Sequence, residues 1–149
     1  FVKFHVDEKK KKIYIFDELY LYQRTNDTLI DKVKEKYDGG RRIVADSAEP
    51  KSIKYFKNNG VRIIGADKGP GSIEYGIKRL KDYEIIIHTE CIHTKNEVAL
   101  YKYKESKDGE ILPVPVDKNN HIIDSLRYST EELGNKANLT PRKNKPAGY

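Results

Sequence analysis

The stretch "RRIVADSAEPKSIKYFKNNGVRIIGA", residues 41–66, decides the fold class of this chain. It contains a short apolar strand, a helix with Pro50 in its first turn, and a second short apolar strand. Apolar runs of this kind are typical of inner strands that are buried on both faces. Strands flanked by crossover helices indicate an α/β protein whose sheet carries helices on both of its faces.

Patterns on either side extend this unit to a whole domain. An antiparallel hairpin is predicted for "FVKFHV" and "KIYIFDELYLY", because both are rich in β-branched and aromatic residues and a polar turn, "DEKKKK", separates them. The antiparallel start, followed by helix and strand units, predicts a mixed β-sheet. We expect further helices at 26–37 with an Asn26/Asp27 cap, at 72–80 with a Ser72 cap, at 89–103 and at 121–133, a strand at 83–88, and a hairpin around Asp108-Gly109.

The composition limits the classes of protein to which the chain can belong. With 149 residues, of which 37% are hydrophobic and 35% charged, the chain is long enough for one domain with its own core. No apolar run approaches the roughly 20 residues that span a bilayer. The single cysteine, Cys91, cannot form an internal disulfide. We therefore expect an intracellular protein with no membrane partner and no zinc site.

Residues 134–149 differ from the rest of the chain. This segment is rich in Asn, Lys, Pro and Thr, carries four of the net six positive charges and contains no acidic residue. We expect a domain over residues 1–133 and a basic tail over 134–149 that is disordered or folds only on a partner. Because the sequence begins at Phe1 and contains no methionine, we also expect the natural polypeptide to continue upstream.

Asp46 is the first candidate site residue. It ends the apolar run of residues 43–45 and so falls at the carboxyl end of an inner strand, where α/β folds bind ligands. Two interpretations are open. Asp46 either forms an Asx turn or cap for the helix that begins near Pro50, or it is a carboxylate that binds a metal ion.

A second candidate group lies in "DKNNHIIDSLRYS", residues 117–129. On a helix, His121, Asp124 and Tyr128 share one stripe. If this stripe faces Asp46, two carboxylates and an imidazole converge, and we expect no neighbouring lysine or arginine to neutralise them. Such a cluster favours a hard divalent cation, Mg²⁺ or Mn²⁺. Alternatively, His121 is a helix-start residue that bonds to a carbonyl group.

Three lysines are candidate DNA contacts. Lys68 lies in the glycine loop "KGPGS" ahead of a helix N-terminus, where it can meet a phosphate, although an ordinary strand-to-helix turn also explains it. Lys9 and Lys10 lie in the turn of the first hairpin, where they either contact the DNA backbone or simply keep the turn soluble. The glycine loop is not a Walker A motif, because no Gly-Lys-Ser/Thr follows at the required spacing, so we expect no ATPase in this domain.

Four motifs resemble a known family in their order and spacing: "IYIFDELY", "RIVADSAEPKSI", "KGPGSIEYGIKRLK" and "PVDKNNHIIDSLRY". Together they resemble the C-terminal nuclease domain of tailed-bacteriophage large terminase subunits, which has a ribonuclease H-like fold. The resemblance covers roughly residues 1–130. Its most specific part consists of Asn120-His121, Asp124 and Arg127-Tyr128.

The resemblance implies a metal-dependent DNA endonuclease. Asp46 and Asp124 would bind Mg²⁺ or Mn²⁺ in a two-metal site, and His121 would be a nearby ligand or acid/base assistant. The family's first strand carries a further aspartate, and the resemblance implies that this strand is missing here. Glu18 would be an outer carboxylate of the site or a structural residue. The implied partners are double-stranded DNA, an upstream ATPase domain of the same polypeptide, a portal protein and a small terminase subunit, in the host cell cytoplasm.

We therefore predict the nuclease domain of a viral packaging terminase, which cuts concatemeric double-stranded DNA. Two alternatives remain open. Another ribonuclease H-like nuclease, of the resolvase or transposase type, needs the same carboxylates and differs only in its substrate. A non-catalytic module that docks on DNA or on a portal is the other alternative, and a missing first aspartate favours it.

Overall fold

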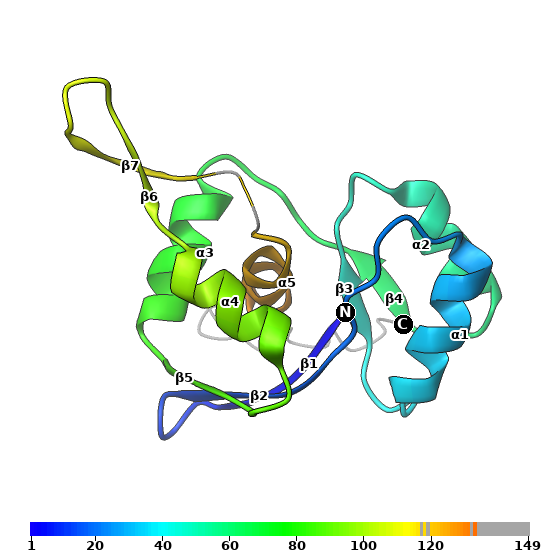
Figure 1. The fold of residues 1–149 in the computed structure, drawn as a ribbon. Helices are drawn as coiled ribbons and strands as arrows, with labels where there is room; N and C mark the ends of the chain where they lie inside the picture. Colours follow the sequence, from blue (N-terminus) through cyan, green and yellow to red (C-terminus); the bar gives the residue numbers. More distant parts are fainter. Residues whose placement is uncertain (117, 119, 132, 134–149) are drawn as a thin grey trace, which may run out of the picture.

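The computed structural model describes residues 1–116, 118, 120–131 and 133. The tail predicted at 134–149 lies outside the described residues. None of the helices in the described ranges is long and apolar enough to cross a membrane. The elements follow in the order β1 (Val2–Asp7), β2 (Lys12–Glu18), α1 (Asn26–Lys36), β3 (Ile43–Ala45), α2 (Pro50–Asn58), β4 (Ile63–Gly65), α3 (Ser72–Lys81), β5 (Glu84–Ile87), α4 (Ile92–Leu100), β6 (Tyr103–Glu105), β7 (Ile111–Pro115) and α5 (His121–Ser129) (Figure 1).

The N-terminal hairpin forms the first sheet. Strands β1 and β2 pair antiparallel, and β5 joins β2 in parallel, so this sheet is mixed and has the order β1-β2-β5. Along β2, Ile13 and Ile15 point into the core, whereas Phe16, the next residue, is 47% exposed. The core over this sheet also contains Leu80 of α3 and Leu126 of α5. The hairpin predicted from the alternating start of the chain is confirmed.

The strand–helix–strand unit of residues 41–66 forms a second sheet. Strands β3 and β4 pair in parallel, and α2 connects them. Pro50 is the first residue of α2, where its fixed φ suits the helix and its missing N–H costs nothing. A second core lies between this sheet and helices α1 and α2, and it contains Ile30, Val33, Phe56, Val61 and Ile63. The unit that decides the fold class is therefore confirmed.

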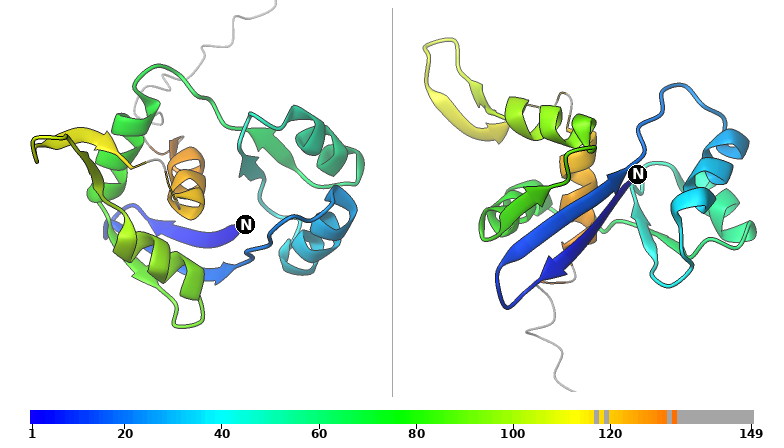
Figure 2. Two further views of the ribbon diagram at one scale, coloured as in Figure 1. Left: turned by 45° about the horizontal axis from the view of Figure 1, so that its top comes forward. Right: turned by 60° about the horizontal axis from the view of Figure 1, so that its bottom comes forward.

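The two sheets do not join into one. The mixed α/β class is confirmed, but in the described part of the chain the strands form three separate hydrogen-bonded sheets, β1-β2-β5, β3-β4 and β6-β7, in place of the single predicted sheet. In these residues β1 forms strand hydrogen bonds only with β2, and β3 only with β4, so no strand bridges the two sheets. Helix α5 contacts both β1 and β3 and so connects the two halves (Figure 2).

Two predicted helix caps differ from the observed ones. The cap of α1 is Thr25, whose hydroxyl accepts a backbone hydrogen bond (3.5 Å), while Asp27 instead accepts a hydrogen bond from the Tyr55 hydroxyl. Gly71, rather than Ser72, caps α3, because Gly71 adopts the left-handed conformation (φ +75°) that turns the chain into the helix.

Helix α4 and strands β6 and β7 are of the predicted type, although the bounds of α4 differ from the predicted ones. Helix α4 is shorter than the predicted 89–103 because β6 begins at Tyr103. The predicted hairpin is formed by β6 and β7, which pair antiparallel around the Asp108-Gly109 turn. This hairpin projects away from the body of the domain (Figure 1).

Candidate metal and DNA site beside the carboxyl end of β3

Asp46 follows β3 directly, at the strand end that the sequence predicts. Its Oδ1 accepts a hydrogen bond from the Ala48 backbone nitrogen (2.8 Å), which is the geometry of an Asx turn. The same oxygen lies 2.5 Å from the Lys68 ammonium. The turn interpretation is thus confirmed. The Asp46 side chain nevertheless remains 49% exposed, so a ligand can still reach the carboxylate.

Lys68 comes from the loop between β4 and α3 and pairs with Asp46 at the strand ends. Its ammonium also lies 5.1 Å from the centre of the Tyr128 ring on α5. Burial raises the pKa of Asp46, but hydrogen bonds from Lys68 and Ala48 and the charge of Lys68 lower it more, so the pKa of this carboxyl lies below its usual value. The hydrogen bond to Asp46 raises the pKa of Lys68. The two groups are therefore an ion pair at neutral pH.

Asp124 is held in the first turn of α5 by two neighbours. Its Oδ1 accepts hydrogen bonds from Arg127 Nη2 (2.8 Å) and Nε (3.1 Å), and its Oδ2 accepts one from Asn120 Nδ2 (3.2 Å). The Arg127 side chain is only 5% exposed, and its Nη1 donates to the Ser72 carbonyl of α3 (3.3 Å). The guanidinium also lies 5.0 Å from the centre of the Tyr128 ring. Helix α5 thus presents the Asp124 carboxylate in a fixed orientation.

The expectation that no lysine or arginine neutralises these carboxylates is wrong. Asp46 is paired with Lys68, and Asp124 is paired with Arg127. The cause is the packing of the β4–α3 loop and of α5, which brings both cations to the Tyr128 ring. We refer to Asp46, Lys68, Asp124, Arg127 and Tyr128 as the strand-end network.

His121 occupies the first position of α5 and lies near the ring of Tyr20. Its ring centre is 6.4 Å from that of Tyr20, and Tyr20 in turn stacks on His93 with the ring centres 4.5 Å apart. The backbone carbonyl of His121 accepts a hydrogen bond from the Ser125 hydroxyl (2.8 Å). The start of α5 is therefore near the loop that follows β2, which carries Tyr20.

The predicted convergence of Asp46, Asp124 and His121 is only partly formed. Helix α5 contacts β3, and Lys68 and Arg127, the partners of Asp46 and Asp124, both lie near the Tyr128 ring, at 5.1 and 5.0 Å from its centre. Over residues 1–116, 118, 120–131 and 133, however, no three His, Cys, Asp or Glu side chains lie close enough together to hold a metal ion. The described residues alone therefore do not form a complete metal site, and the shared site remains a prediction.

Glu97 of α4 is a residue that the sequence analysis missed. Its side chain is buried, and its Oε1 accepts hydrogen bonds from the backbone nitrogens of Ile122 (2.6 Å) and Ile123 (2.8 Å), so it caps α5. Burial raises the pKa of Glu97, although these two hydrogen bonds and the charge of His121 partly oppose the rise. A carboxylate at the N-terminus of a helix is favourable. Glu97 therefore fixes where α5 begins, and with it the place of the helix's candidate ligands.

Glu18 has the structural role that the sequence left open. Its carboxylate accepts hydrogen bonds from the backbone nitrogens of His93 (2.9 Å) and Thr94 (2.8 Å) and from the Thr94 hydroxyl (2.6 Å), and so caps α4. Burial raises the pKa of Glu18, but these hydrogen bonds lower it more, so the pKa lies below its usual value.

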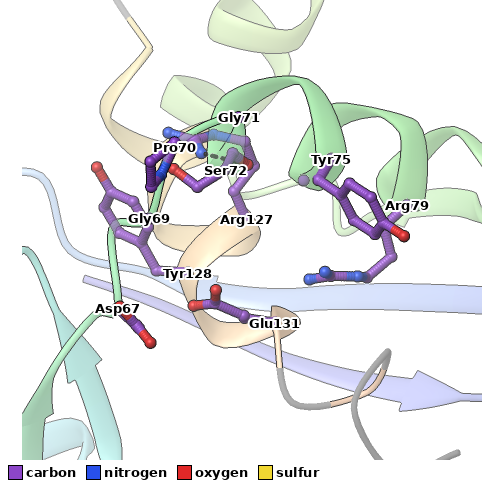
Figure 3. A pocket seen from close by; sticks show the side chains of 11 residues that line it. Asp67, Gly69, Pro70, Gly71, Ser72, Tyr75, Arg79, Arg127, Tyr128 and Glu131 are labelled. Carbon is purple, nitrogen blue, oxygen red and sulfur yellow. Dashed lines mark hydrogen bonds between the residues drawn. The ribbon is translucent and has the colours of Figure 1, made fainter.

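A cavity of about 250 Å³ lies between the start of α3 and helix α5 (Figure 3). Tyr75 and Arg79 of α3 line one side of it, and Arg127, Tyr128 and Glu131 line the other. Tyr75 is largely exposed. Because Arg127 and Tyr128 belong to the strand-end network, the cavity adjoins that network.

Lys9 and Lys10 lie in the turn between β1 and β2. The Lys10 backbone nitrogen donates to Asp7 Oδ1 (3.0 Å), and its ammonium lies 3.8 Å from Asp7 Oδ2. The turn is at the end of the hairpin that points away from β3 (Figures 1 and 2). These lysines are therefore not part of the strand-end network, and their contact with DNA stays a prediction.

The sequence of this chain matches a known protein family. Residues 1–132 match the family model described as "Terminase RNAseH like domain", so the chain belongs to this family, and the resemblance noted in the sequence is confirmed. The chain is 39% identical over 137 residues to the terminase large subunit of Bacillus phage SPP1 and 32% identical over 132 residues to the PBSX phage terminase large subunit of Bacillus subtilis (strain 168). Each alignment covers 88% of this chain but only 32% and 30% of the relative, so the chain spans about a third of their length.

Two solved structures are similar to the fold. The nuclease domain of the SPP1 large terminase g2p, crystallised with bound Mn, superposes with a TM-score of 0.80 at 36% identity over 88% of this chain and 76% of that domain. The large terminase of a thermophilic bacteriophage superposes with a TM-score of 0.65 at 19% identity over 89% of this chain and 36% of that protein, a likeness of fold alone.

Proposed function

We propose that this domain is the metal-dependent endonuclease of a phage DNA-packaging terminase and that it cuts concatemeric double-stranded DNA. The observation that supports this most strongly is the likeness to the SPP1 nuclease domain, whose structure contains bound Mn. The position of Asp46 supports it further, because α/β folds bind ligands at the carboxyl ends of their strands.

The donor types beside β3 fit Mg²⁺ or Mn²⁺. Asp46 and Asp124 offer carboxylate oxygens, which hard divalent cations prefer, and His121 offers an imidazole, which Mn²⁺ accepts more readily than Mg²⁺. Asp46 and Asp124 would hold the ions, with His121 as a nearby ligand or acid/base assistant. When bound, a pair of such ions would supply an activated water molecule and charge stabilisation for the leaving 3′ oxygen of a phosphodiester. Since the described residues form no group of three donors, a further ligand or a rearrangement must complete the site.

The chain's own residues would prepare this site in two ways. Arg127 is buried and holds Asp124 by two hydrogen bonds, which fixes the direction of the carboxylate. Lys68 keeps its positive charge beside Asp46, where it can bind a phosphate of the DNA backbone. Lys9 and Lys10 would extend contact with the backbone in a manner that is independent of sequence and sensitive to salt.

The remaining two thirds of the polypeptide would carry the other functions of a packaging motor. We propose an upstream ATPase domain, with a portal protein and a small terminase subunit as partners, in the host cell cytoplasm. We also propose that the longer polypeptide supplies the family's first strand and its aspartate beside the edges of β1 and β3, which have no strand between them in the described residues. Such a strand would join the two sheets and provide the further metal ligand.

One observation favours a second candidate function. Among the residues that the structure describes, no three metal-binding side chains are grouped, which suits a non-catalytic module that docks on DNA or on a portal. A resolvase-type nuclease would share the carboxylates and differ from a terminase in its preference for branched DNA.

Plasmid cleavage in Mn²⁺ or Mg²⁺ tests the proposal, with this chain and with a longer polypeptide that contains it. Asp46→Asn is the informative variant. Asp38→Asn is its control, because Asp38 is also an exposed carboxylate (63%) that is paired with a single lysine, 3.2 Å away. We expect the longer form to cut the plasmid, Asp46→Asn to abolish cutting, and Asp38→Asn to retain it. Salt-sensitive DNA binding without cutting in every form would contradict the nuclease and favour the docking module.

A further inference from the structure

The strand-end network is electrically balanced without a metal ion. Its two carboxylates, Asp46 and Asp124, are paired with Lys68 and Arg127 at 2.5 and 2.8 Å. A positive charge within hydrogen-bond distance of a carboxylate opposes the approach of a divalent cation to the same oxygens. A metal ion that binds Asp46 or Asp124 must therefore compete with the cation that is already there.

The two cations differ in their freedom to move. Arg127 is 5% exposed, bonds to the Ser72 carbonyl, and packs so closely on Gly76 that a Cβ there would lie 2.9 Å from two of its carbons. Lys68 is 35% exposed and comes from a loop. Breaking a buried ion pair is costly, whereas an exposed pair contributes little to stability. Lys68 is therefore the cation that can leave.

We propose that Lys68 is a displaceable counter-ion of the metal site: its ammonium holds Asp46 when no metal ion is bound and leaves when a divalent cation arrives. The inference rests on the proposed function, because it concerns the metal that this function requires. After displacement the ammonium stays on the loop beside α5, at the edge to which the proposed substrate brings phosphates. Metal binding would thereby free Lys68 to hold the DNA backbone.

The competition predicts a specific effect of removing the lysine on metal affinity. Lys68→Gln removes the competing charge, Lys68→Arg keeps it, and Asp46→Asn removes the ligand. Lys12→Gln is the matched control, because Lys12 is 32% exposed and forms a 3.0 Å ion pair with Glu84, in the β1-β2-β5 sheet. This control lowers the net charge of the chain equally and so corrects for general attraction of cations.

The experiment is a Mn²⁺ titration, in the absence of DNA, of the chain and of the longer polypeptide that contains it, followed through the paramagnetic resonance signal of free Mn²⁺. We expect Lys68→Gln to bind Mn²⁺ roughly two- to five-fold more tightly than Lys12→Gln, which is the range that an exposed ion pair contributes. We expect Lys68→Arg to bind no more tightly than the unsubstituted chain. Circular dichroism of each variant confirms that it is folded.

The other outcomes overturn the inference in distinguishable ways. Equal affinities of Lys68→Gln and Lys12→Gln, with binding still lost in Asp46→Asn, would reject the counter-ion role but leave the metal site in place. Mn²⁺ binding that is absent from both the chain and the longer polypeptide, or that Asp46→Asn does not weaken, would reject the metal site itself and the inference with it. A Lys68→Gln variant that fails to fold would show that the lysine is a structural clamp, which also rejects the counter-ion role.

Discussion

Gly76, in the interior of α3, lies against the buried side chain of Arg127, and Gly76→Ala tests that contact. In a helix interior this substitution normally stabilises a protein by about 0.5–1 kcal/mol. Here the new Cβ would lie 2.9 Å from both Cγ and Cδ of Arg127 and 3.2 Å from its Cβ, so the arginine must shift. Because overpacking of a buried site costs roughly 1–3 kcal/mol, we expect a net loss of about 1–2 kcal/mol in the free energy of unfolding.

Urea unfolding followed by circular dichroism measures this loss in two backgrounds. In the Arg127→Ala background the two atoms at 2.9 Å, Cγ and Cδ, are gone and only the Cβ at 3.2 Å remains, so Gly76→Ala should there lose most of its cost and stabilise by up to about 1 kcal/mol. Gly69→Ala is a control for glycine replacement in the same region, since a Cβ at Gly69 meets no atom within 4 Å. If Gly76→Ala has the same effect with and without the arginine, Arg127 does not pack on Gly76, and the fixed orientation of Asp124 loses its support.

Capping, thiol burial and surface charge give three more predictions. Glu18→Gln should cost about 1 kcal/mol at pH 7. Because the folded-state pKa of Glu18 is lowered, this cost should be present above the unfolded-state pKa of about 4.3 and vanish as the pH falls through the folded-state pKa. Urea unfolding at pH 7 and pH 3 measures the cost, and an equal cost at both pH values contradicts the prediction. Cys91 is 1% exposed and burial raises the pKa of its thiol, so an aromatic disulfide reagent should label it only in denaturant; rapid labelling of the folded protein refutes the burial. Replacing both Lys9 and Lys10 by Gln should reduce the slope of log affinity for duplex DNA against log salt by about 2, and an unchanged slope shows that neither contacts a phosphate.

The fold was predictable where its signals are local. The apolar runs on either side of α2 and the alternation along β2 determine the type of each element, since strand and helix periods differ. Strand pairing depends instead on contacts between distant segments, so the sequence did not reveal that the β1-β2-β5 and β3-β4 sheets stay separate in the described residues. The cap of α1 was misplaced because Thr25, Asn26 and Asp27 are all good capping residues.

The candidate site was also predictable only where its signals are local in the sequence. Asp46 was found from its place at a strand end, and Asp124 from its place on a helix stripe. The Asp124–Arg127 pair could have been found as well, because residues three apart on a helix are neighbours. The Asp46–Lys68 pair and the cap that Glu97 provides could not, since they join residues 22 and 25 positions apart and exist only in the folded chain.

A crystal structure from crystals grown with Mn²⁺, with the metal located by anomalous scattering, most directly tests the claim that this domain is a metal-dependent nuclease. It can be determined for this chain and for the longer polypeptide. We predict an anomalous peak within about 2.0–2.6 Å of carboxylate oxygens of Asp46 and Asp124, the range of bond lengths for hard divalent cations. A folded protein in saturating Mn²⁺ with no peak at these two carboxylates, or with peaks only at other residues, would contradict the claim that this edge of the fold is a metal-dependent active site.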